Sequence, residues 1–549
     1  MIVQLLYNRQ MRSEDEIRAF LSRSFPVDNP YLLKGMNEAV TRLRRAIRSA
    51  EPIAVYGDYD VDGVTATALL VSTLQALGAR VEPFIPRRKH EGYGLRESAL
   101  EELGSRGIKL VVTVDCGVRS IDEAKFAQAQ GLDLIITDHH SVSSELPPAV
   151  AIVDPKQPDE SYPYRHLTGV GLAFKLAQGL LRVERWVPLS KAEGLPEEDS
   201  LLDLVALGTI ADLAPLTGEN RALVSRGLEK LNQAPRAGVA AMLREAALRP
   251  GQIDARSVGY VLGPRLNAAG RLDDAAASYR LLVASSDEEA TALAYQLGAT
   301  NQERQRLMKE MVEHARQEAA EAGDANIYVL ASPAYASGIA GLVASRILDE
   351  FYRPAIVIAV DEEKGESKGS ARSIEGLDIT AALGELDTML LRYGGHKAAA
   401  GFTIKNENIP EFRRRMQKLA TERLDDDQLQ PLLEIDMSMP LRMATLETVQ
   451  LIEALQPFGV DNERPTFVSS GVRVCDCRSV GVDGRTLKFR LGDGTGMWDA
   501  VAFRQSMRAD GVPQCIDVAY TVQRNDWNGK VDAELMIRDW RPAEGVPCV

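Results

Sequence analysis

The alternation of short apolar runs with helical segments, from residue 51 to about residue 230, is the feature that most constrains the fold of this chain. "PIAVYGD" precedes "GVTATALLVSTLQALG", "KLVVTVD" precedes "SIDEAKFAQAQG", and "DLIITDHH" and "AVAIVDP" follow. Strands that alternate with helices through short connections build a parallel sheet covered by helices on both faces. Ligands of such folds bind at the carboxyl ends of the strands. We therefore expect the functional side chains at the ends of these runs.

Acidic residues and histidines stand at these predicted strand ends. The turn "GDYDVDG" follows the first run, Asp115 follows "LVVTV", and "DHH" follows "LDLII". A further carboxylate, Asp212, ends the apolar stretch "LLDLVALGTIAD". Because the carboxyl ends of parallel strands meet at one edge of the sheet, we expect these side chains to converge. The residues concerned are Asp58, Asp60, Asp62, Asp115, Asp138, His139, His140 and Asp212.

Each of these residues also has an ordinary structural explanation. Asp62 can cap the helix that follows it, and Asp212 can cap a helix or a turn. "DYDVDG" resembles the start of a calcium loop, although the flanking strand and long apolar helix argue against an EF-hand. Several carboxylates with one or two imidazoles at one edge favour Mn²⁺ or Mg²⁺. Two such ions lower the pKa of a bridging water, so phosphoester hydrolysis is the reaction that the pattern indicates.

The rest of the chain predicts a mixed architecture. Residues 285–322 are rich in Ala, Leu, Gln, Glu and Arg without Pro, which predicts a long helix that acts as a spacer. A second α/β unit begins at "ANIYVLAS", and short strands with Gly/Asp turns after "PLLEIDMSM" predict a small β-barrel of the oligonucleotide-binding (OB) type. The predicted domains are an N-terminal helical cap (1–45), a parallel-sheet α/β domain (46–284), the connecting helix (285–322), a smaller α/β domain (323–430) and the barrel (431–549).

Composition limits the classes of function. The net charge of −14 argues against a protein that coats nucleic acid nonspecifically, but it permits a basic groove on an acidic body. No apolar run approaches the ~20 residues needed to span a bilayer. The first residues become acidic and helical too early for a secretory signal, so we expect a cytoplasmic protein. Five cysteines are too few for a disulfide framework, and Cys116 is expected to be structural.

Four segments, "GDYDVDG", "VDCG", "TDHH" and "GTIADLAPLTGENR", resemble the successive motifs of the DHH phosphoesterase superfamily. Others, including "IPRRKHEGYGL", "VLGPRLNAAGRL", "GSARS", "RYGGHKAAAG" and "LQPFGVDNERPTF", resemble its bacterial single-strand-specific exonucleases, from about residue 50 to about residue 505. The resemblance implies a DHH catalytic domain, a DHHA1 substrate-binding domain and an OB-type barrel. It also implies a two-metal 5′→3′ exonuclease that hydrolyses single-stranded DNA to mononucleotides in DNA repair and recombination. The implied partners are single-stranded DNA, single-stranded-DNA-binding protein and a helicase.

The resemblance also implies roles for the residues at the strand ends. His140 would face the scissile phosphate, and Asp138 would orient an imidazole from the second coordination shell. Asp58 would lie in or beside the first coordination shell. The implied metal ligands are Asp60, Asp62, Asp115, His139 and Asp212.

Phosphate contacts follow from the same resemblance. Ser370, Arg372 and Arg88 would hold a terminal phosphate, with Arg87 able to exchange roles with Arg88. Arg265, Asn267 and Arg271 would contact the DNA backbone or the scissile phosphate, Arg265 as a catalytic group, and His396 would contact substrate. The alternative for these arginines is a set of interdomain ion pairs, and for His396 an ordinary surface position. In the barrel, Phe467, Phe489, Trp498 and Phe503 are stacking candidates, though most aromatic residues of a small barrel belong to its core.

Two other functions compete with the exonuclease. A small-substrate DHH phosphatase would cleave short nucleotides or pyrophosphate, and activity on long strands that is lost without residues 431–549 would exclude it. An inactive relative would serve as a replication scaffold. The intact set Asp60, Asp62, Asp115, His139 and Asp212 argues against that interpretation.

Overall fold

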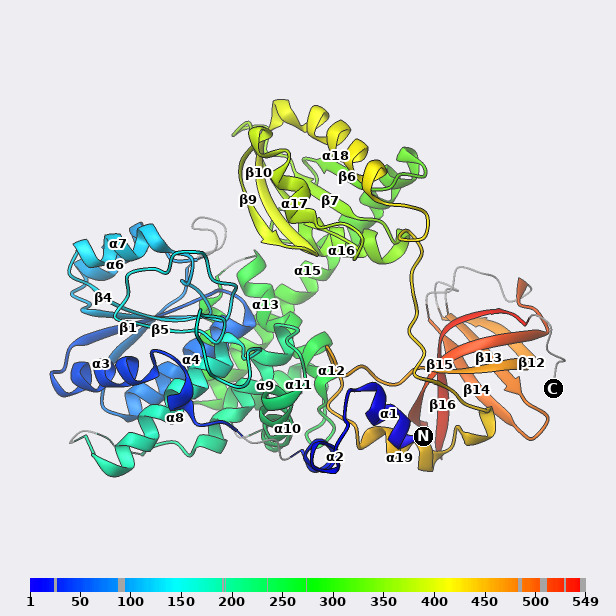
Figure 1. The fold of residues 1–549 in the computed structure, drawn as a ribbon, viewed down its shortest axis with the longest axis horizontal. Helices are drawn as coiled ribbons and strands as arrows, with labels where there is room; N and C mark the ends of the chain where they lie inside the picture. The colour runs from blue at the N-terminus through cyan, green and yellow to red at the C-terminus, as the bar shows by residue number, and fades with distance from the viewer. Residues whose placement is uncertain are drawn as a thin grey trace.

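The first domain is built on the predicted parallel sheet (Figure 1). The computed structural model describes residues 1–23, 27–86, 94–189, 192, 194–234, 236–272, 274–481, 486–503, 511–527 and 530–543. Five strands lie in the order β2-β1-β3-β4-β5, and all neighbouring pairs are parallel. The strands are β1 (Pro52–Gly57), β2 (Arg80–Phe84), β3 (Leu110–Val114), β4 (Asp133–Thr137) and β5 (Ala151–Val153).

Helices cover both faces of this sheet because both faces of its strands are apolar. Val55 and Val112 point into a core shared with α3 (Met36–Arg48), α4 (Val61–Ala76), α8 (Gly169–Trp186) and α9 (Leu202–Ala211). Tyr56 and Val111 point to the other face, against α6 (Glu97–Ser105) and α7 (Ile121–Ala129). The first core continues into α10 (Gly218–Gln233), α11 (Ala237–Glu245), α12 (Ala255–Ser257), the π-helical turn η3 (Val258–Leu262), α13 (Gly263–Leu272) and α14 (Ala276–Val283).

The predicted long helix is α15 (Asp287–Ala322), which has 36 residues. It does more than separate two domains. Leu293 and Leu297 in its first half belong to the core of the first domain, whereas Met311 and Ala315 in its second half belong to a core of the second α/β unit. Each half is therefore packed into one of the domains that the helix joins.

The second α/β unit has a mixed sheet in the order β6-β7-β8-β10-β9. Only β6 and β7 pair in parallel in this sheet, and its other neighbouring strands are antiparallel. The elements are β6 (Tyr328–Ser332), α16 (Ala340–Phe351), β7 (Ala355–Ala359), β8 (Glu366–Arg372), α17 (Ile379–Gly384), β9 (Leu390–His396), β10 (Ala399–Lys405) and α18 (Ile409–Arg423).

The C-terminal strands form the predicted closed barrel, since β12 pairs with both β13 and β15. Phe467 and Phe489 lie in its core, which explains two of the four aromatic residues considered for stacking, while Phe503 is exposed. The elements are β11 (Met437–Ser438), α19 (Leu446–Glu453), β12 (Phe467–Val480), β13 (Thr486–Gly492), β14 (Met497–Ala502), β15 (Cys515–Trp527) and β16 (Lys530–Pro542). Short 3-10 turns are η1 (Pro30–Leu32), η2 (Glu198–Leu201), η4 (Asp387–Met389), η5 (Asn406–Asn408) and η6 (Leu441–Met443).

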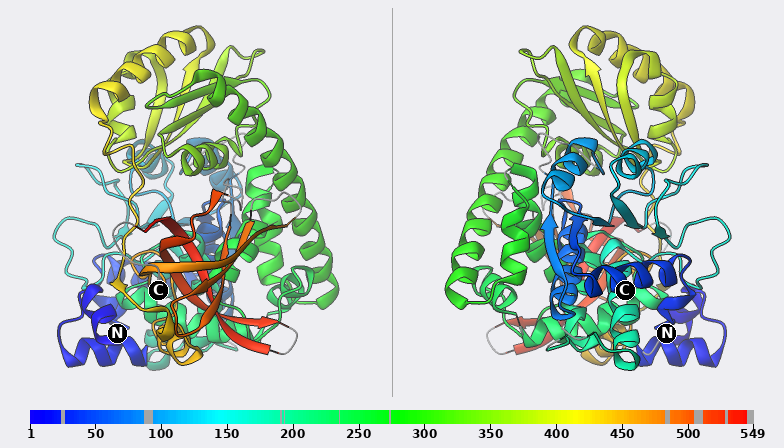
Figure 2. Two further views of the ribbon diagram at one scale, coloured as in Figure 1. Left: turned by 90° about the vertical axis from the view of Figure 1, so that its right-hand side faces the viewer. Right: turned by 90° about the vertical axis from the view of Figure 1, so that its left-hand side faces the viewer.

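The N-terminal helices do not form one cap. Leu5 and Leu6 of α1 (Ile2–Asn8) and Phe20 of α2 (Glu14–Ser22) belong to the core of the barrel, whereas α3 packs on the parallel sheet. Figures 1 and 2 show the N-terminus beside the barrel, although the strands of the barrel come from the other end of the sequence. The first and last parts of the chain therefore form one folded unit.

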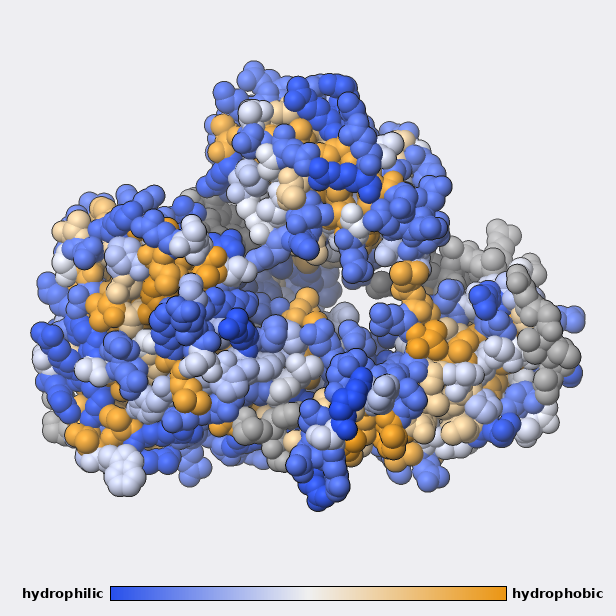
Figure 3. Space-filling model, in the orientation of Figure 1, coloured by the Kyte–Doolittle hydropathy of each residue, from blue (hydrophilic) through white to orange (hydrophobic). Residues whose placement is uncertain are grey.

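The three bodies surround an opening. The space-filling view shows it between the second α/β unit and the barrel, on a surface that is largely hydrophilic (Figure 3). Among the described residues, no helix is both long enough and apolar enough to cross a membrane.

Candidate metal centre

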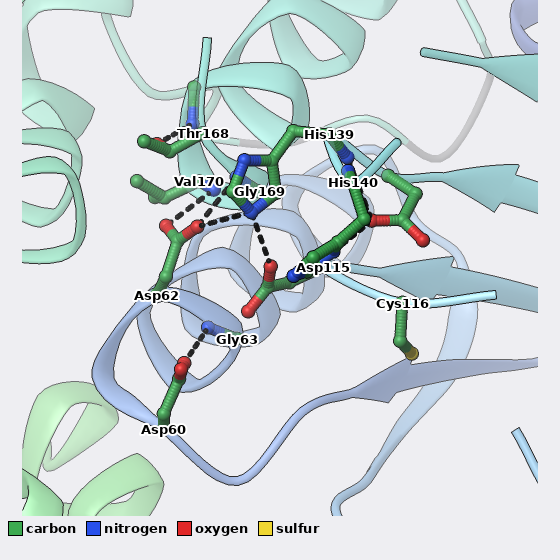
Figure 4. A network of polar contacts seen from close by, with 12 residues as sticks. Asp60, Asp62, Gly63, Asp115, Cys116, His139, His140, Thr168, Gly169 and Val170 are labelled. Atoms are coloured by element: carbon green, nitrogen blue, oxygen red, sulfur yellow. Dashed lines mark hydrogen bonds and ion pairs between the residues drawn. The ribbon is translucent and has the colours of Figure 1, made fainter. Parts of the chain in front are cut away.

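The turn between β1 and α4 supplies the first carboxylates (Figure 4). Asp60 is the N-cap of α4, and its carboxylate accepts a hydrogen bond from Gly63 N at 3.1 Å. The capping alternative for Asp62 is therefore wrong. Asp62 is buried in the first turn of α4 and accepts the N–H groups of Gly169 (2.6 Å) and Val170 (2.8 Å), at the start of α8. A helix N-terminus stabilises a carboxylate in this position.

Asp115 follows β3 in a conformation that side chains rarely adopt. Its φ is 65°, in the left-handed region, and its N–H donates to Thr137 O at 3.0 Å. Gly169 lies directly against it, because a Cβ at Gly169 would be 2.4 Å from Asp115 Cβ. Strained backbone of this kind concentrates at functional sites.

The two histidines after β4 have different partners. His139 Nε2 lies 3.0 Å from Asp115 Oδ1 and 3.8 Å from Asp62 Oδ2. His140 Nδ1 lies 2.7 Å from Asp138 Oδ1, and Val118 N donates to Asp138 Oδ2 at 2.9 Å. Asp138 therefore orients the ring of His140, while His139 faces the carboxylates.

Within the described part of the chain, the metal-ligand candidates from these strand ends meet Asp212 in three overlapping groups. Asp212 lies at the C-cap of α9, the kind of position that its capping alternative predicted. Ligand atoms within each group lie within 4.8 Å of one another. The groups are Asp115, His139 and His140; Asp62, His139 and Asp212; and Asp58, Asp60 and Asp115.

Burial and mutual repulsion dominate the electrostatics of these carboxylates. Burial, followed by the charge of Asp60, raises the pKa of Asp62 to about 7. Burial and the charges of Asp62 and Asp60 raise the pKa of Asp212 to about 8, and the pKa of Asp115 is raised well above its usual value by burial and Asp62. Buried carboxylates of this kind are stabilised in their charged form by a cation.

The imidazoles complement this arrangement. Burial, followed by the charge of His140, lowers the pKa of His139 to about 3, so its ring is neutral, as a metal ligand requires. Burial also opposes a charge on His140, but the hydrogen bond and charge of Asp138 outweigh it and raise the pKa of His140 to about 8. Oxygen donors with a neutral imidazole fit Mn²⁺ or Mg²⁺.

The predicted phosphate contacts of α13 have other partners in this structure. Arg265 Nε donates to Glu245 Oε2 at 2.6 Å, an ion pair within the first domain. Asn267 Oδ1 accepts from Val61 N at 3.1 Å, beside Asp60. Arg271 Nη1 donates to Gly338 O at 3.4 Å, across to the segment that precedes α16. The ion pair of Arg265 is thus internal to the first domain, and the described contact of Arg271 reaches a carbonyl of the second unit.

The second α/β unit presents its own candidates. Ser370 and Arg372 are two residues apart on β8 and therefore share a face. Arg372 packs against α16, since a Cβ at Gly341 would be 3.0 Å from its Nη2. His396 ends β9, and its pKa is lowered by partial burial and then by the positive charge of His140. His396 therefore lies within electrostatic reach of His140. Arg88 and Arg87 lie outside the described residues.

Comparisons with known proteins agree with this architecture. Family models match residues 52–209 (DHH family, N-terminal domain), 324–422 (DHHA1 domain) and 435–539 (RecJ OB domain). The single-stranded-DNA-specific exonuclease RecJ of Dickeya dadantii is 36% identical, over 93% of this chain and 91% of that protein. The chain belongs to the RecJ family. The RecJ of Bacillus subtilis is 38% identical over 98% of this chain and 67% of its own length. The crystal structure of RecJ from Thermus thermophilus with Mn²⁺ has a TM-score of 0.84 at 33% identity, covering 100% of this chain and 76% of that one.

The resemblance to the RecJ family that the motifs indicated is thus confirmed, but sequence reasoning missed three residues near the centre. Lys156 Nζ donates to His139 O, and Asp154, whose pKa is raised to about 7 by burial and Asp138, follows the end of β5. The strand-end rule that found Asp115 applies equally to "AVAIVDP" and was the available signal.

The third residue is Arg304 of α15, which lines a cavity of about 170 Å³ between the two domains. Its Nε donates to Asn301 Oδ1 at 3.1 Å, and no described residue offers it a carboxylate within ion-pair distance. Burial and then Arg346 lower its pKa. Arg304 and Asn301 continue the row of Leu293 and Leu297 on the buried face of the helix. This helical spacing was the available signal, and the interpretation of the helix as a spacer overlooked it. The cavity is lined by Ala211, Gly259, Gly263, Pro264, Asn267, Arg271, Arg304 and Leu342.

Proposed function

We propose that this RecJ-family chain is a Mn²⁺- or Mg²⁺-dependent exonuclease that removes nucleotides from the 5′ end of single-stranded DNA in DNA repair and recombination. The observation that carries the proposal is the convergence of five aspartates and a neutral His139 at one edge of the parallel sheet. The names of the related proteins support the substrate. The proposed 5′→3′ polarity follows the family resemblance.

The donor set defines where the ions would bind. Asp115 and His139 each belong to two of the three groups. A carboxylate has two oxygens for two ions, whereas a neutral imidazole offers one lone pair, so we assign Asp115 as the ligand shared by two ions. Bound ions would supply a water of lowered pKa and a Lewis acid for the phosphoryl oxygens. The proposed ligands are Asp58, Asp60, Asp62, Asp115, His139 and Asp212.

The remaining groups would act on the phosphate and the strand. Asp138 holds the ring of His140 and favours its charged form, which suits a group that faces developing negative charge. Arg265, Asn267 and Arg271 would contact the backbone near the scissile phosphate, and Arg304 extends this basic surface along α15. For Arg265 to do so, its ion pair with Glu245 must open or orient it.

The second α/β unit would select the strand end. We assign Ser370, Arg372 and Arg88 to the terminal phosphate, because a hydroxyl and a guanidinium on one face form a fork for its oxygens. His396 would contact the substrate from the side opposite His140. The barrel would guide the strand as a unit. Single-stranded-DNA-binding protein and a helicase are proposed partners, and the cytoplasm, where the chromosome of a bacterium lies, is the proposed compartment.

Digestion of oligonucleotides labelled at either end, single- and double-stranded, tests this proposal. We expect release of labelled mononucleotide from the 5′-labelled single strand with Mn²⁺, and none with EDTA. Release from the 3′ label first would contradict the polarity. Activity on short nucleotides alone, unchanged when residues 431–549 are removed, would instead identify a small-substrate phosphatase.

A further inference from the structure

Arg221 is a fully buried cation that the proposed reaction does not use. It lies in α10, within the "GENR" segment that follows Asp212 in the chain, and its exposed fraction is 0%. No described residue places a carboxylate within ion-pair distance of it. Burial, followed by the charges of Arg23 and Arg9, lowers the pKa of Arg221 to about 9. A buried charge is costly unless hydrogen bonds satisfy it, so its partners explain its place.

Those partners are backbone carbonyls from two segments that lie far from α10 in the sequence. Nη2 donates to Gln456 O at 2.6 Å, and Nη1 donates to Pro457 O at 3.3 Å. Nη2 also reaches Phe20 O at 3.5 Å, and the guanidinium carbon lies 3.8 Å from the centre of the Phe20 ring. One side chain of the catalytic domain thus holds both the end of α2 and the loop after α19.

Backbone packing at the same place leaves little room. Leu216 N, in the segment between α9 and α10, donates to Val460 O at 2.8 Å. A Cβ at Gly459 would lie 2.6 Å from Leu216 Cδ1. Close approach of the 455–462 loop to the catalytic domain therefore depends on the absence of a side chain at Gly459.

The barrel side of the contact is held in shape independently of Arg221. Asn462 Nδ2 donates to Leu455 O (3.0 Å) and Pro457 O (2.8 Å), which closes the loop on itself. Arg9 Nε donates to Asn462 Oδ1 at 2.9 Å, and joins the loop to α1. Because α1 and α2 also share the barrel core, residues 1–23 and the described residues of 436–543 form one body, which we term the barrel unit.

We propose that Arg221 is the positioning residue that docks the barrel unit on the catalytic domain and thereby sets the path of a long strand to the metal centre. The second half of this statement rests on the proposed function. A planar guanidinium satisfies several carbonyls at once, which the single ammonium of lysine does not. Because the acceptors of its two Nη groups come from both α2 and the 455–462 loop, these groups find their partners only when the barrel unit is in place.

Small-angle scattering of the full chain with Arg221→Met tests the docking. We expect a larger radius of gyration and faster thermolysin cleavage within residues 424–436, at the exposed Leu432 and Leu433, with Arg221→Lys intermediate. The matched control is Arg226→Gln on the same helix, an arginine that is 43% exposed and pairs with Asp199, and it should scatter like the wild type.

Kinetics on two substrate lengths test the strand path. For a long single strand, the KM of Arg221→Met should rise by at least about tenfold with kcat unchanged, because a flexibly tethered barrel loses effective concentration at the cleft. For an oligonucleotide of about four nucleotides, too short to engage the barrel and the cleft together, both constants should stay at wild-type values. Loss of docking with an unchanged KM on the long strand would overturn the strand-path half of the proposal.

Scattering that superimposes on that of the wild type would overturn the docking role. Should Arg221→Met fail to fold, Gly459→Val approaches the same contact from the barrel side and leaves α10 intact. It should expand the molecule in the same way, and an unchanged scattering curve would overturn the proposal. Failure of the wild type to digest DNA would refute the proposed function alone, because scattering still decides the docking.

Discussion

The metal centre and the Arg221 contact both bury charge of a single sign, but different groups satisfy that charge. The metal centre gathers five aspartates, and burial together with neighbouring carboxylates raises the pKa values of Asp62, Asp115 and Asp212. Arg221, in contrast, is a lone cation among backbone carbonyls. One charge can be met by a few well-placed dipoles from the same chain. Five like charges on one edge need a cation. Buried charge therefore indicates a ligand site only where the chain's own polar groups are too few to satisfy it.

Removal of the carboxylate that two ions would share should have the largest effect. Asp115→Ala should lower the rate of Mn²⁺-dependent hydrolysis by at least about 10²–10³-fold, because groups that stabilise the reacting phosphate are lost. Release of nucleotides from an end-labelled single strand measures the effect. Asp133→Asn, at the opposite end of the neighbouring strand β4, is the matched control and should keep full activity. Full hydrolysis by Asp115→Ala would refute the assigned site.

Stability of the metal-free protein gives the next largest effect. The pKa values of Asp62 (about 7) and Asp212 (about 8) exceed the value of about 3.9 for unfolded aspartate. Between the unfolded and the folded values, the folded state therefore binds more protons than the unfolded state. The free energy of unfolding should therefore fall as the pH rises from about 4 to about 8. Mn²⁺ at a hundred times its Kd should restore about 2.7 kcal/mol.

Thermal unfolding at several pH values, with Mn²⁺ or with EDTA, measures this effect. The stabilisation by Mn²⁺ should be larger at the upper end of that pH range, where the ions no longer compete with protons. Arg221→Met should show the same increment as the wild type, because its contact contains no proposed metal ligand. If the stabilisation by Mn²⁺ were lost in Arg221→Met, the Arg221 contact and the metal centre would not be independent sites.

Asp138→Asn probes a carboxylate that supports the centre through His140. The substitution keeps the size of the side chain but removes the charge that orients the ring at 2.7 Å. We expect a fall in activity of about 10–100-fold, as for other residues that orient groups beside a metal. Asp122→Asn, an exposed position on α7, serves as control. Wild-type activity of Asp138→Asn would show that the hydrogen bond is only structural.

The smallest expected effect concerns Arg304, a half-buried cation without an acidic partner among the described residues. Arg304→Gln should weaken binding of single strands uniformly across sequences and lower the salt-dependence slope by about 0.7, the value for one lost phosphate contact. Fluorescence anisotropy in Ca²⁺ at several salt concentrations measures it. Arg306→Gln on the same helix, where Glu303 and Glu310 already pair with the arginine, should leave the slope unchanged. Equal salt-dependence slopes for both variants would show that Arg304, like Arg221, contacts the protein itself rather than the DNA.

The short-range features of this chain were predictable from its sequence. Apolar runs of strand length that alternate with helical segments specify the parallel sheet, and the topology of such a sheet brings the ends of β1, β3 and β4 to one edge. Asp60, Asp115 and His139 could thus be placed together without coordinates. The closed barrel was predictable for the same reason, since its strands and turns are local patterns.

Tertiary structure alone decided which groups satisfy one another across long separations. Three contacts illustrate this: Asp62 accepts from the start of α8 rather than capping α4, α1 and α2 pack in the barrel core, and Arg221 donates to Gln456. In each of them the local pattern of one segment contains no information about its partner. Periodicity determines which face of an element is buried, whereas the identity of the neighbour depends on how whole domains pack. Local sequence patterns therefore specify the chemistry available at the sheet edge, whereas the packing of the domains selects which charges are left for a metal, a strand or the chain's own backbone.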